Sequence, residues 1–157
     1  MISVNLQKAI DNLRIHDVYL VSSIAQCFNG FEPKYDPNTE ELDTQTKHLV
    51  KETQIVKIND TNLLARIFIE FGIRFIDSKV NNEKESIRAC VEAVFVVEYT
   101  LNQELEQVCI DEYALKNASF HVWAYWREFL MNQCNRMYLP RLVLPTMQLA
   151  HNRHQIE

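Results

Sequence analysis

The stretch "LLARIFIEFGIRF", residues 63–75, decides the fold of this chain. Every odd-numbered position in it is apolar, whereas Arg66, Glu70 and Arg74 occupy even-numbered positions. Successive side chains of a strand point to opposite faces of a sheet, so this alternation predicts a long strand. One face of the strand is expected to be apolar and the other more polar.

The stretch "IRACVEAVFVVEYTL", residues 87–101, repeats the alternation after a polar connection at residues 77–86. Two long alternating strands joined locally predict an antiparallel pair. Residues 14–28 are rich in β-branched and aromatic side chains, and residues 45–58 have a mixed pattern. These two stretches are predicted to be further strands of the same sheet.

Residues 29–44, between the first two predicted strands, form the clearest loop because they contain one glycine and two prolines. A loop of this length in a small domain is usually functional or disordered. Phe31 and Tyr35 lie within it, although a simple spacer would not need aromatic side chains. We therefore expect a crossover loop with a role in function.

Helical patterns occur at both ends of the chain. Residues 3–13 place apolar side chains on one face, with Ser3 or Asn5 as the N-cap. Residues 103–117 form a second predicted helix with Asn102 as its cap, and residues 119–138 form a third that ends before a proline.

This order of elements predicts an α+β fold. It consists of a four-stranded antiparallel sheet with a long crossover loop, a short N-terminal helix and two C-terminal helices. With 157 residues the chain is expected to form a single domain over residues 1–157, including a polar tail at residues 146–157.

The predicted helix at residues 119–138, "SFHVWAYWREFLMNQCNRMY", has no clearly polar side. An ordinary surface helix has one apolar stripe, so a single sheet would leave part of this helix uncovered. We interpret the pattern as a surface that packs against a second copy of the chain in an oligomer. The predicted interface residues are Val122, Trp126, Phe129 and Met137.

Composition excludes several function classes. The net charge of −5 without a Lys/Arg cluster argues against nucleic-acid binding. The chain has only 2 glycines and no glycine-rich phosphate loop. No apolar run is long enough to cross a bilayer and no secretory signal is recognisable, so we expect no membrane span. The 4 cysteines include no CxxC pair, which favours reduced thiols in the cytoplasm.

No constellation of catalytic or metal-ligating residues is evident, so we predict a protein that is not an enzyme and has no cofactor or metal. His151 and His154 could share a face, but no carboxylate or thiol lies near them in the sequence. Cys134 with His121 as its base is the one alternative, that of a hydrolase. Clustered aromatic residues instead favour an apolar groove for extended polypeptide.

The segment "HVWAYWREFLMNQCNRMYLPRLVLP" resembles the SecB family of tetrameric export chaperones. The family pattern is an aromatic-Pro-Tyr-x-Arg-Glu helix followed by a Leu-Pro segment, and Ala124 here replaces its proline. The matching residues are Trp123, Tyr125, Arg127, Glu128, Arg136, Leu139, Pro140, Leu142 and Leu144. Residues 89–101 also resemble the last strand of that family. The resemblance implies a homotetramer built as a dimer of dimers.

The resemblance also implies a client groove formed by the crossover loop, the second strand and the C-terminal helical region. Carried to this sequence, its residues are Phe31, Tyr35, Leu42, Leu49, Trp123, Leu130, Leu142 and Leu144. Export members dock the SecA translocase motor on acidic residues of the exposed sheet face. The corresponding positions here are Ser22, Gln26 and Glu92, of which Glu92 alone is acidic.

The N-terminal helix resembles that of SecB-like chaperones in toxin–antitoxin–chaperone systems. We therefore predict an ATP-independent holdase that binds unfolded or aggregation-prone polypeptide and protects an antitoxin. The first alternative is a general export chaperone that delivers precursors to SecA. The second is an oligomeric adaptor without chaperone activity.

Overall fold

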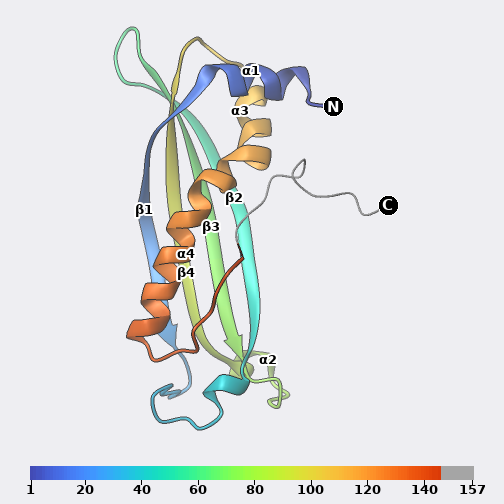
Figure 1. Ribbon diagram of the computed structural model, residues 1–157, viewed down its shortest axis with the longest axis vertical. Helices are drawn as coiled ribbons and strands as arrows, with labels where there is room; N and C mark the ends of the chain where they lie inside the picture. Colours follow the sequence, from blue (N-terminus) through green and yellow to red (C-terminus); the bar gives the residue numbers. More distant parts are fainter. Residues whose placement is uncertain (146–157) are drawn as a thin grey trace.

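The fold is built on one four-stranded antiparallel sheet, with strand order β1-β4-β3-β2 (Figure 1). The computed structural model describes residues 1–145, so the predicted tail at residues 146–157, with His151 and His154, lies outside the described residues. The strands are β1 Leu13–Cys27, β2 Asp43–Lys57, β3 Leu63–Ile76 and β4 Ile87–Leu101. The predicted fold class is confirmed.

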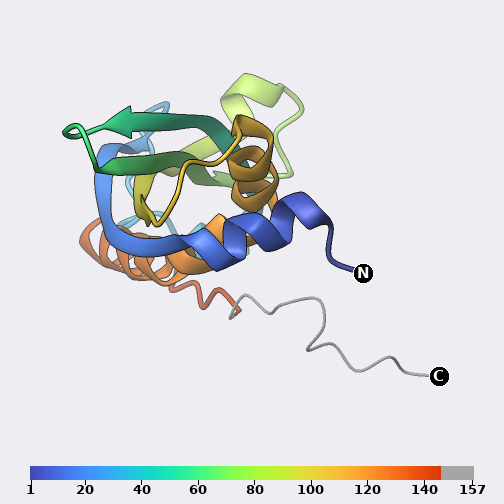
Figure 2. The same ribbon diagram turned by 90° about the horizontal axis from the view of Figure 1, so that it is seen from above.

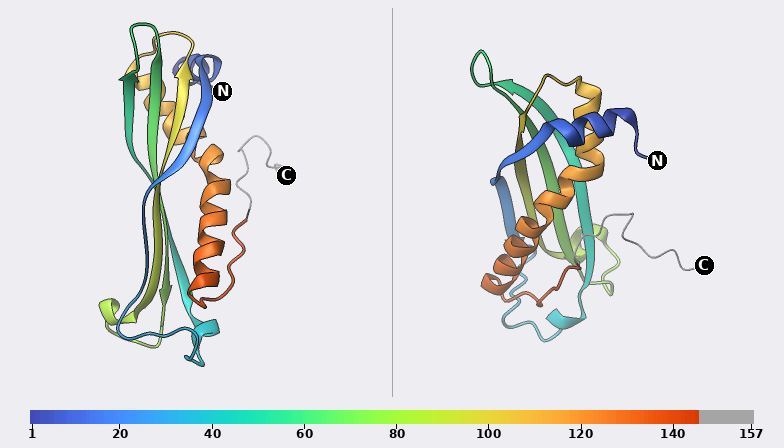
Figure 3. Two further views of the ribbon diagram at one scale, coloured as in Figure 1. Left: turned by 90° about the vertical axis from the view of Figure 1, so that its left-hand side faces the viewer. Right: turned by 45° about the horizontal axis from the view of Figure 1, so that its top comes forward.

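The alternation in β3 and β4 divides the sheet into two faces. Ile67, Ile69 and Phe71 of β3 are fully buried, and β4 buries Val91 and Val97 on the same side. This side is called the covered face because the long C-terminal helix packs on it (Figure 3). The opposite side, called the open face, carries the charged residues of both strands, as the sequence predicts.

The predicted N-terminal helix is α1, Val4–Asn12, and it leads directly into β1. Ser3 is its N-cap, since the Ser3 hydroxyl accepts a hydrogen bond from the backbone N–H of Leu6 at 3.0 Å. Leu6 and Ala9 are buried, and α1 lies against the first C-terminal helix (Figure 2). The helix thus closes one end of the covered face.

The C-terminal helices follow one another without a loop. They are α3 Gln107–Tyr113, a π-helical turn η2 Ala114–Ala118, and α4 Ser119–Arg136. The predicted cap at Asn102 is wrong, because α3 begins five residues later and the backbone N–H of Asn102 bonds to Asn12. Residues 102–106 belong to no helix or strand and bury Leu105 as the chain crosses from β4 to the covered face.

The end of α4 directs the chain back along the sheet. Tyr138 adopts a left-handed conformation with φ of 56°, and the backbone N–H of Leu139 donates to the carbonyl of Cys134 at 3.0 Å. This is the Schellman arrangement that commonly ends helices. The chain beyond it, residues 139–145, is called the terminal segment, and it lies between α4 and β2 (Figure 1).

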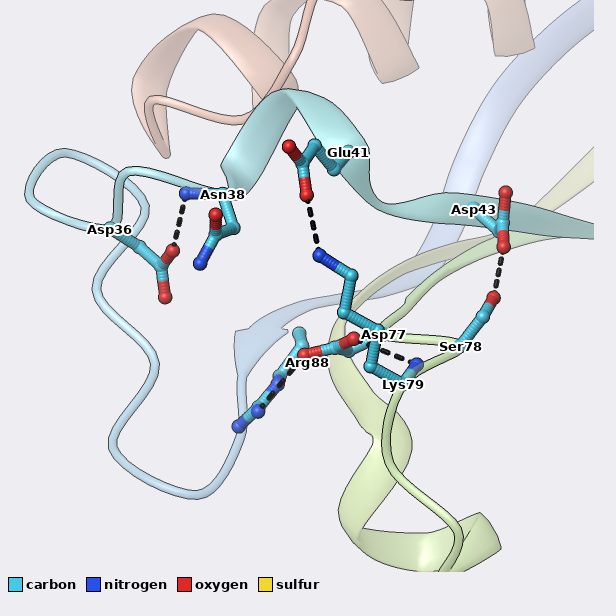
Figure 4. A network of polar contacts seen from close by, with 8 residues as sticks. All are labelled: Asp36, Asn38, Glu41, Asp43, Asp77, Ser78, Lys79 and Arg88. Atoms are coloured by element: carbon cyan, nitrogen blue, oxygen red, sulfur yellow. Dashed lines mark hydrogen bonds and ion pairs between the residues drawn. The ribbon is translucent and has the colours of Figure 1, made fainter.

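The crossover loop between β1 and β2 is ordered and contains a short 3-10 helix, η1 Thr39–Glu41. Polar contacts tie it to the connection between β3 and β4 (Figure 4). Lys79 Nζ lies 2.8 Å from a carboxylate oxygen of Glu41, and the Ser78 hydroxyl donates to Asp43. That connection, predicted only as polar, also contains the short helix α2, Glu83–Ser86.

Candidate binding groove

Helix α4 has a narrow buried stripe rather than apolar contacts all round. Val122, Trp126, Leu130 and Cys134 recur every fourth residue and are buried against β3 and β4. Phe71 of β3 is the centre of this contact, with its ring stacked on that of Trp126 at 5.6 Å between centroids. These side chains fix α4 on the covered face.

A groove of about 320 Å³ lies between β2 and α4. Its walls come from four parts of the chain that meet only in the fold. They are Thr46, Lys47 and His48 of β2, Gly72 and Ile73 of β3, Trp123, Trp126 and Leu130 of α4, and Leu144 and Pro145 of the terminal segment. The exposed surface inside it is mostly apolar, which suits an apolar ligand.

His48 forms the polar part of the β2 wall. Its Nε2 lies 2.6 Å from the hydroxyl of the buried Ser119, and its ring stacks on Phe71 at 4.9 Å between centroids. Burial lowers the pKa of His48 below its ordinary value of 6.5. The hydrogen bond therefore links a neutral imidazole on the edge strand to the first residue of α4.

The strand order explains why β2 can line a groove. It lies at the edge of the sheet and pairs with β3 on one side only. A register shift between Val50 and Glu52 leaves Lys51 as an extra residue. Edge strands have unpaired backbone groups along their free side, and extended peptides can pair with such groups.

The terminal segment forms the remaining wall. The indole N–H of Trp123 donates a hydrogen bond of 2.8 Å to the backbone carbonyl of Pro145. Leu142 and Leu144 are half-buried against the core, whereas Arg141 and Val143 are exposed. A second hollow of about 250 Å³ lies on the other side of the segment, with Leu142 and Met131 in its lining.

The structure brings together only part of the predicted groove. Trp123, Leu130 and Leu144 line it, although Leu130 is fully buried at its base. Leu142 lines the second hollow beside it. Three of the predicted residues thus lie in the C-terminal wall of the groove, and whether they bind a client stays a prediction.

The predicted residues of the crossover loop lie elsewhere. Phe31 is buried in the core, Leu42 is half-buried, and Tyr35 is 74% exposed. Lys34 Nζ lies 5.4 Å from the ring of Tyr35 and 5.3 Å from that of Tyr138. The loop therefore meets the C-terminal end of α4, next to the second hollow and not in the groove.

The assignment of Leu49 to the groove is wrong. Leu49 pairs with Glu70 and is 49% exposed on the open face, whereas His48 pairs with Phe71 on the covered face. No sequence pattern pointed to His48, because β2 carries polar residues on both faces. The closest signal was the strand's alternation, which the extra residue at Lys51 interrupts.

The predicted docking face is assembled as expected on the open face. Ser22 pairs with Val94, Gln26 pairs with Cys90, and Glu92 lies between these positions on β4. Glu92, however, is an ion-pair partner of Lys47, whose Nζ lies 3.3 Å from one of its carboxylate oxygens and 3.2 Å from Glu70. The negative charge of Glu92, the one acidic residue at the three predicted docking positions, is thus offset by the positive charge of Lys47.

The predicted oligomer interface needs a correction. Val122 and Trp126 are buried within their own chain, and Phe129 and Met137 are half-buried against its core. Apolar surface remains at Phe120, Tyr125 and Met131 on the outer side of α4. Ile15 and Leu20 of β1 are exposed on the covered face, which α4 does not cover at that edge. These five residues are called the outer apolar face.

The geometry does not support the hydrolase alternative. His121 and Cys134 lie about 20 Å apart along α4, so the imidazole cannot act on the thiol. The hydroxyl of Tyr99 lies 2.7 Å from Nδ1 of His121, and burial raises the pKa of Cys134 to about 11. Residues 1–145 contain no cluster of side chains that could hold a metal ion.

Residues 1–145 also include no helix that is long and apolar enough to span a membrane. All four cysteines of the chain, which lie in this part, are free thiols. Arg127, in the motif that carries the SecB resemblance, has a buried Nε without a hydrogen-bond partner among the described residues.

Comparison with known proteins gives one kind of match. No family model matches the chain, and no curated protein sequence does. Among solved structures, it is similar to a SecB-like chaperone of Mycobacterium tuberculosis, solved in complex with a peptide from the HigA1 antitoxin. The TM-score is 0.71 at 16% sequence identity, over 93% of this chain and 98% of that one. The chain therefore has the SecB-like fold that the sequence predicts.

Proposed function

We propose that this protein is an ATP-independent holdase chaperone. The observation that carries the proposal is the apolar groove between the edge strand β2 and α4. Apolar contact is non-directional, so such a groove accepts many sequences, and the edge strand offers backbone groups to an extended polypeptide. A catalytic role is not part of the proposal, and neither is a cofactor.

Release of the client needs no nucleotide in this proposal. The two glycines, Gly30 and Gly72, lie far apart in a turn and a strand, so no phosphate-binding loop is assembled. Clients leave by mass action or by transfer to a partner. Ordering a flexible client offsets most of the gain from apolar contact, which keeps the binding reversible.

The client that we favour is an antitoxin of a toxin–antitoxin–chaperone system. Support comes from the similar mycobacterial chaperone, which was solved with an antitoxin peptide. The helix α1 before the first strand also resembles that class. The free thiols agree with a reducing cytoplasm, where such a client would be made.

General export through SecA is the alternative. It has less support because Ser22 and Gln26 are uncharged and Glu92 is paired with Lys47. Fewer free acidic charges on a docking surface reduce the association rate with a basic partner. An oligomeric adaptor without client binding is the remaining alternative.

We also propose that the chain assembles as a homotetramer, a dimer of dimers. The support is the outer apolar face, which combines the outer side of α4 with the uncovered edge at β1. Large exposed apolar patches usually mark an interface. A second copy would cover it without using the groove, which lies on the β2 side of α4.

The experiment that tests holdase activity is aggregation of a denatured model protein, followed by light scattering without nucleotide. We expect suppression at one tetramer per client, and aggregation at the uninhibited rate would contradict the proposal. The client is then tested by co-expression with any antitoxin encoded next to this gene. Protection of that antitoxin from proteolysis supports the favoured role. Rescue of precursor export in a strain without its own export chaperone, with no such protection, supports the alternative.

A further inference from the structure

The terminal segment has the features of a polypeptide bound in the groove. Residues 140–145 belong to no helix or strand and run back along the sheet (Figure 1). Leu142 and Leu144 turn towards the core while Arg141 and Val143 turn towards solvent. Alternating apolar contacts on an extended backbone are also what a strand-like client would make beside β2.

Residues 140–145 make few hydrogen bonds to the rest of the described structure. Within residues 1–145, the one hydrogen bond made by residues 140–145 is that from the Trp123 indole to the carbonyl of Pro145. No backbone hydrogen bond joins these described residues to β2. Within the described part of the chain, residues 140–145 are therefore held by two half-buried leucine side chains and a single hydrogen bond, unlike a paired strand of the sheet.

We propose that residues 142–145, which border the groove, cover part of the surface that a client contacts and are displaced when a client binds. This inference rests on the proposed holdase function and adds its regulation. It also defines the client chemistry: an extended stretch with apolar side chains at alternate positions, whose backbone carbonyl takes the Trp123 hydrogen bond from Pro145.

Displacement has a measurable consequence. If the groove is open for only a fraction of the time, the apparent affinity for a client falls by that fraction. Weakening the segment must then tighten client binding. If the segment were instead a permanent wall of the groove, the same change would remove client contacts and loosen binding.

The test compares Leu144→Ser with Val143→Ser. Leu144 lines the groove, whereas its neighbour Val143 is 69% exposed, so the control removes a similar apolar side chain from the outer side. The probe is reduced, carboxymethylated α-lactalbumin with a fluorescent label, titrated by anisotropy. We expect Leu144→Ser to bind it about fivefold more tightly than the unmodified protein, and Val143→Ser to bind it within about twofold.

A second measurement follows the segment without any client. The Trp123 indole N–H resonance of the full chain is recorded by NMR, with Trp126→Phe for assignment. We expect Leu144→Ser to move this resonance towards that of a solvent-exposed indole and Val143→Ser to leave it in place. An unchanged resonance in Leu144→Ser would show that Leu144 does not hold the segment, and would overturn the inference.

The outcomes separate the two proposals. If the unmodified protein binds the probe and Leu144→Ser binds it equally or more weakly, the displacement is wrong and the holdase function stands. If neither protein binds the probe, the holdase function fails and the inference fails with it. Binding by Leu144→Ser alone would support a groove that its own segment closes.

Discussion

The rings of Phe71 and Trp126 lie parallel, with an interplanar angle of 11° and 5.6 Å between their centroids. Phe71 belongs to the central strand β3 and Trp126 to the middle of α4, so this stack joins the two layers of the fold. His48 stacks on Phe71 at 4.9 Å, and Trp123 meets its edge at 5.7 Å. The base of the groove is therefore part of the hydrophobic core.

Replacing Phe71 by alanine is expected to lower the free energy of unfolding by about 3–5 kcal/mol, because a fully buried ring is lost from this stack. Urea denaturation followed by fluorescence measures the loss. Phe68→Ala is the matched control, since Phe68 is half-buried on the open face of the same strand, beneath the guanidinium of Arg66. Equal losses in the two variants would contradict the assignment of the faces.

Acidification is expected to destabilise the fold through His48. Burial holds the pKa of His48 below 6.5, so the unfolded chain binds a proton more readily than the folded chain. The neutral form of His48 therefore contributes its full share to the free energy of unfolding above pH 6.5. That share is lost as the pH falls through the lowered pKa of the folded chain. His121, half-buried beside Tyr99, acts in the same direction, since partial burial lowers its pKa.

The measurement is the melting temperature between pH 5 and pH 8 for the unmodified chain, His48→Gln and His121→Gln. Each substitution should flatten the fall in melting temperature below pH 6.5. A curve as steep in the double variant as in the unmodified chain would show that other groups control the acid sensitivity.

A charged side chain at Tyr35 is expected to weaken client binding. Tyr35→Asp should raise the dissociation constant for an unfolded model protein about fivefold, because a client that extends beyond the groove to the C-terminal end of α4 loses contact with this exposed ring. The melting temperature should change little, since Tyr35 is largely exposed. Fluorescence anisotropy and a thermal melt give the two values.

Leu49→Asp is the matched control for Tyr35→Asp. Leu49 is also exposed and apolar but lies on the open face, away from the groove. Client binding by Leu49→Asp should equal that of the unmodified protein. If Leu49→Asp weakened binding and Tyr35→Asp did not, clients would bind the open face instead.

A charge on the outer apolar face is expected to weaken assembly. Met131→Glu places a carboxylate in the proposed interface, where burying it is costly, so the tetramer should dissociate to smaller species at micromolar concentration. Sedimentation velocity gives the mass. Val56→Glu, at an exposed position on the open face, should leave the mass unchanged. A monomeric unmodified chain would refute the assembly itself.

The sequence was sufficient for the sheet and the N-terminal helix because their patterns are local. Alternation in β3 and β4 determined which side chains lie on the covered face, and Ser3 with three apolar residues determined α1. The pattern was weaker in β2, where Leu49 and His48 exchange faces relative to the prediction. Polar side chains on both faces and the extra residue at Lys51 removed the signal that specifies register.

Only the tertiary structure decided which side of α4 faces the sheet and what borders the groove. The sequence of α4 is apolar nearly all round, so it could not assign Val122 and Trp126 to the core and Phe120 and Met131 to solvent. That choice depends on where the helix lies on β3 and β4. The contact between Trp123 and Pro145 depends likewise on the turn at Tyr138, which directs the chain back along β2. Contacts between residues that are distant in the chain produce no periodic pattern in the sequence. The residues that line the groove could therefore be identified only from the packing of α4 on the sheet.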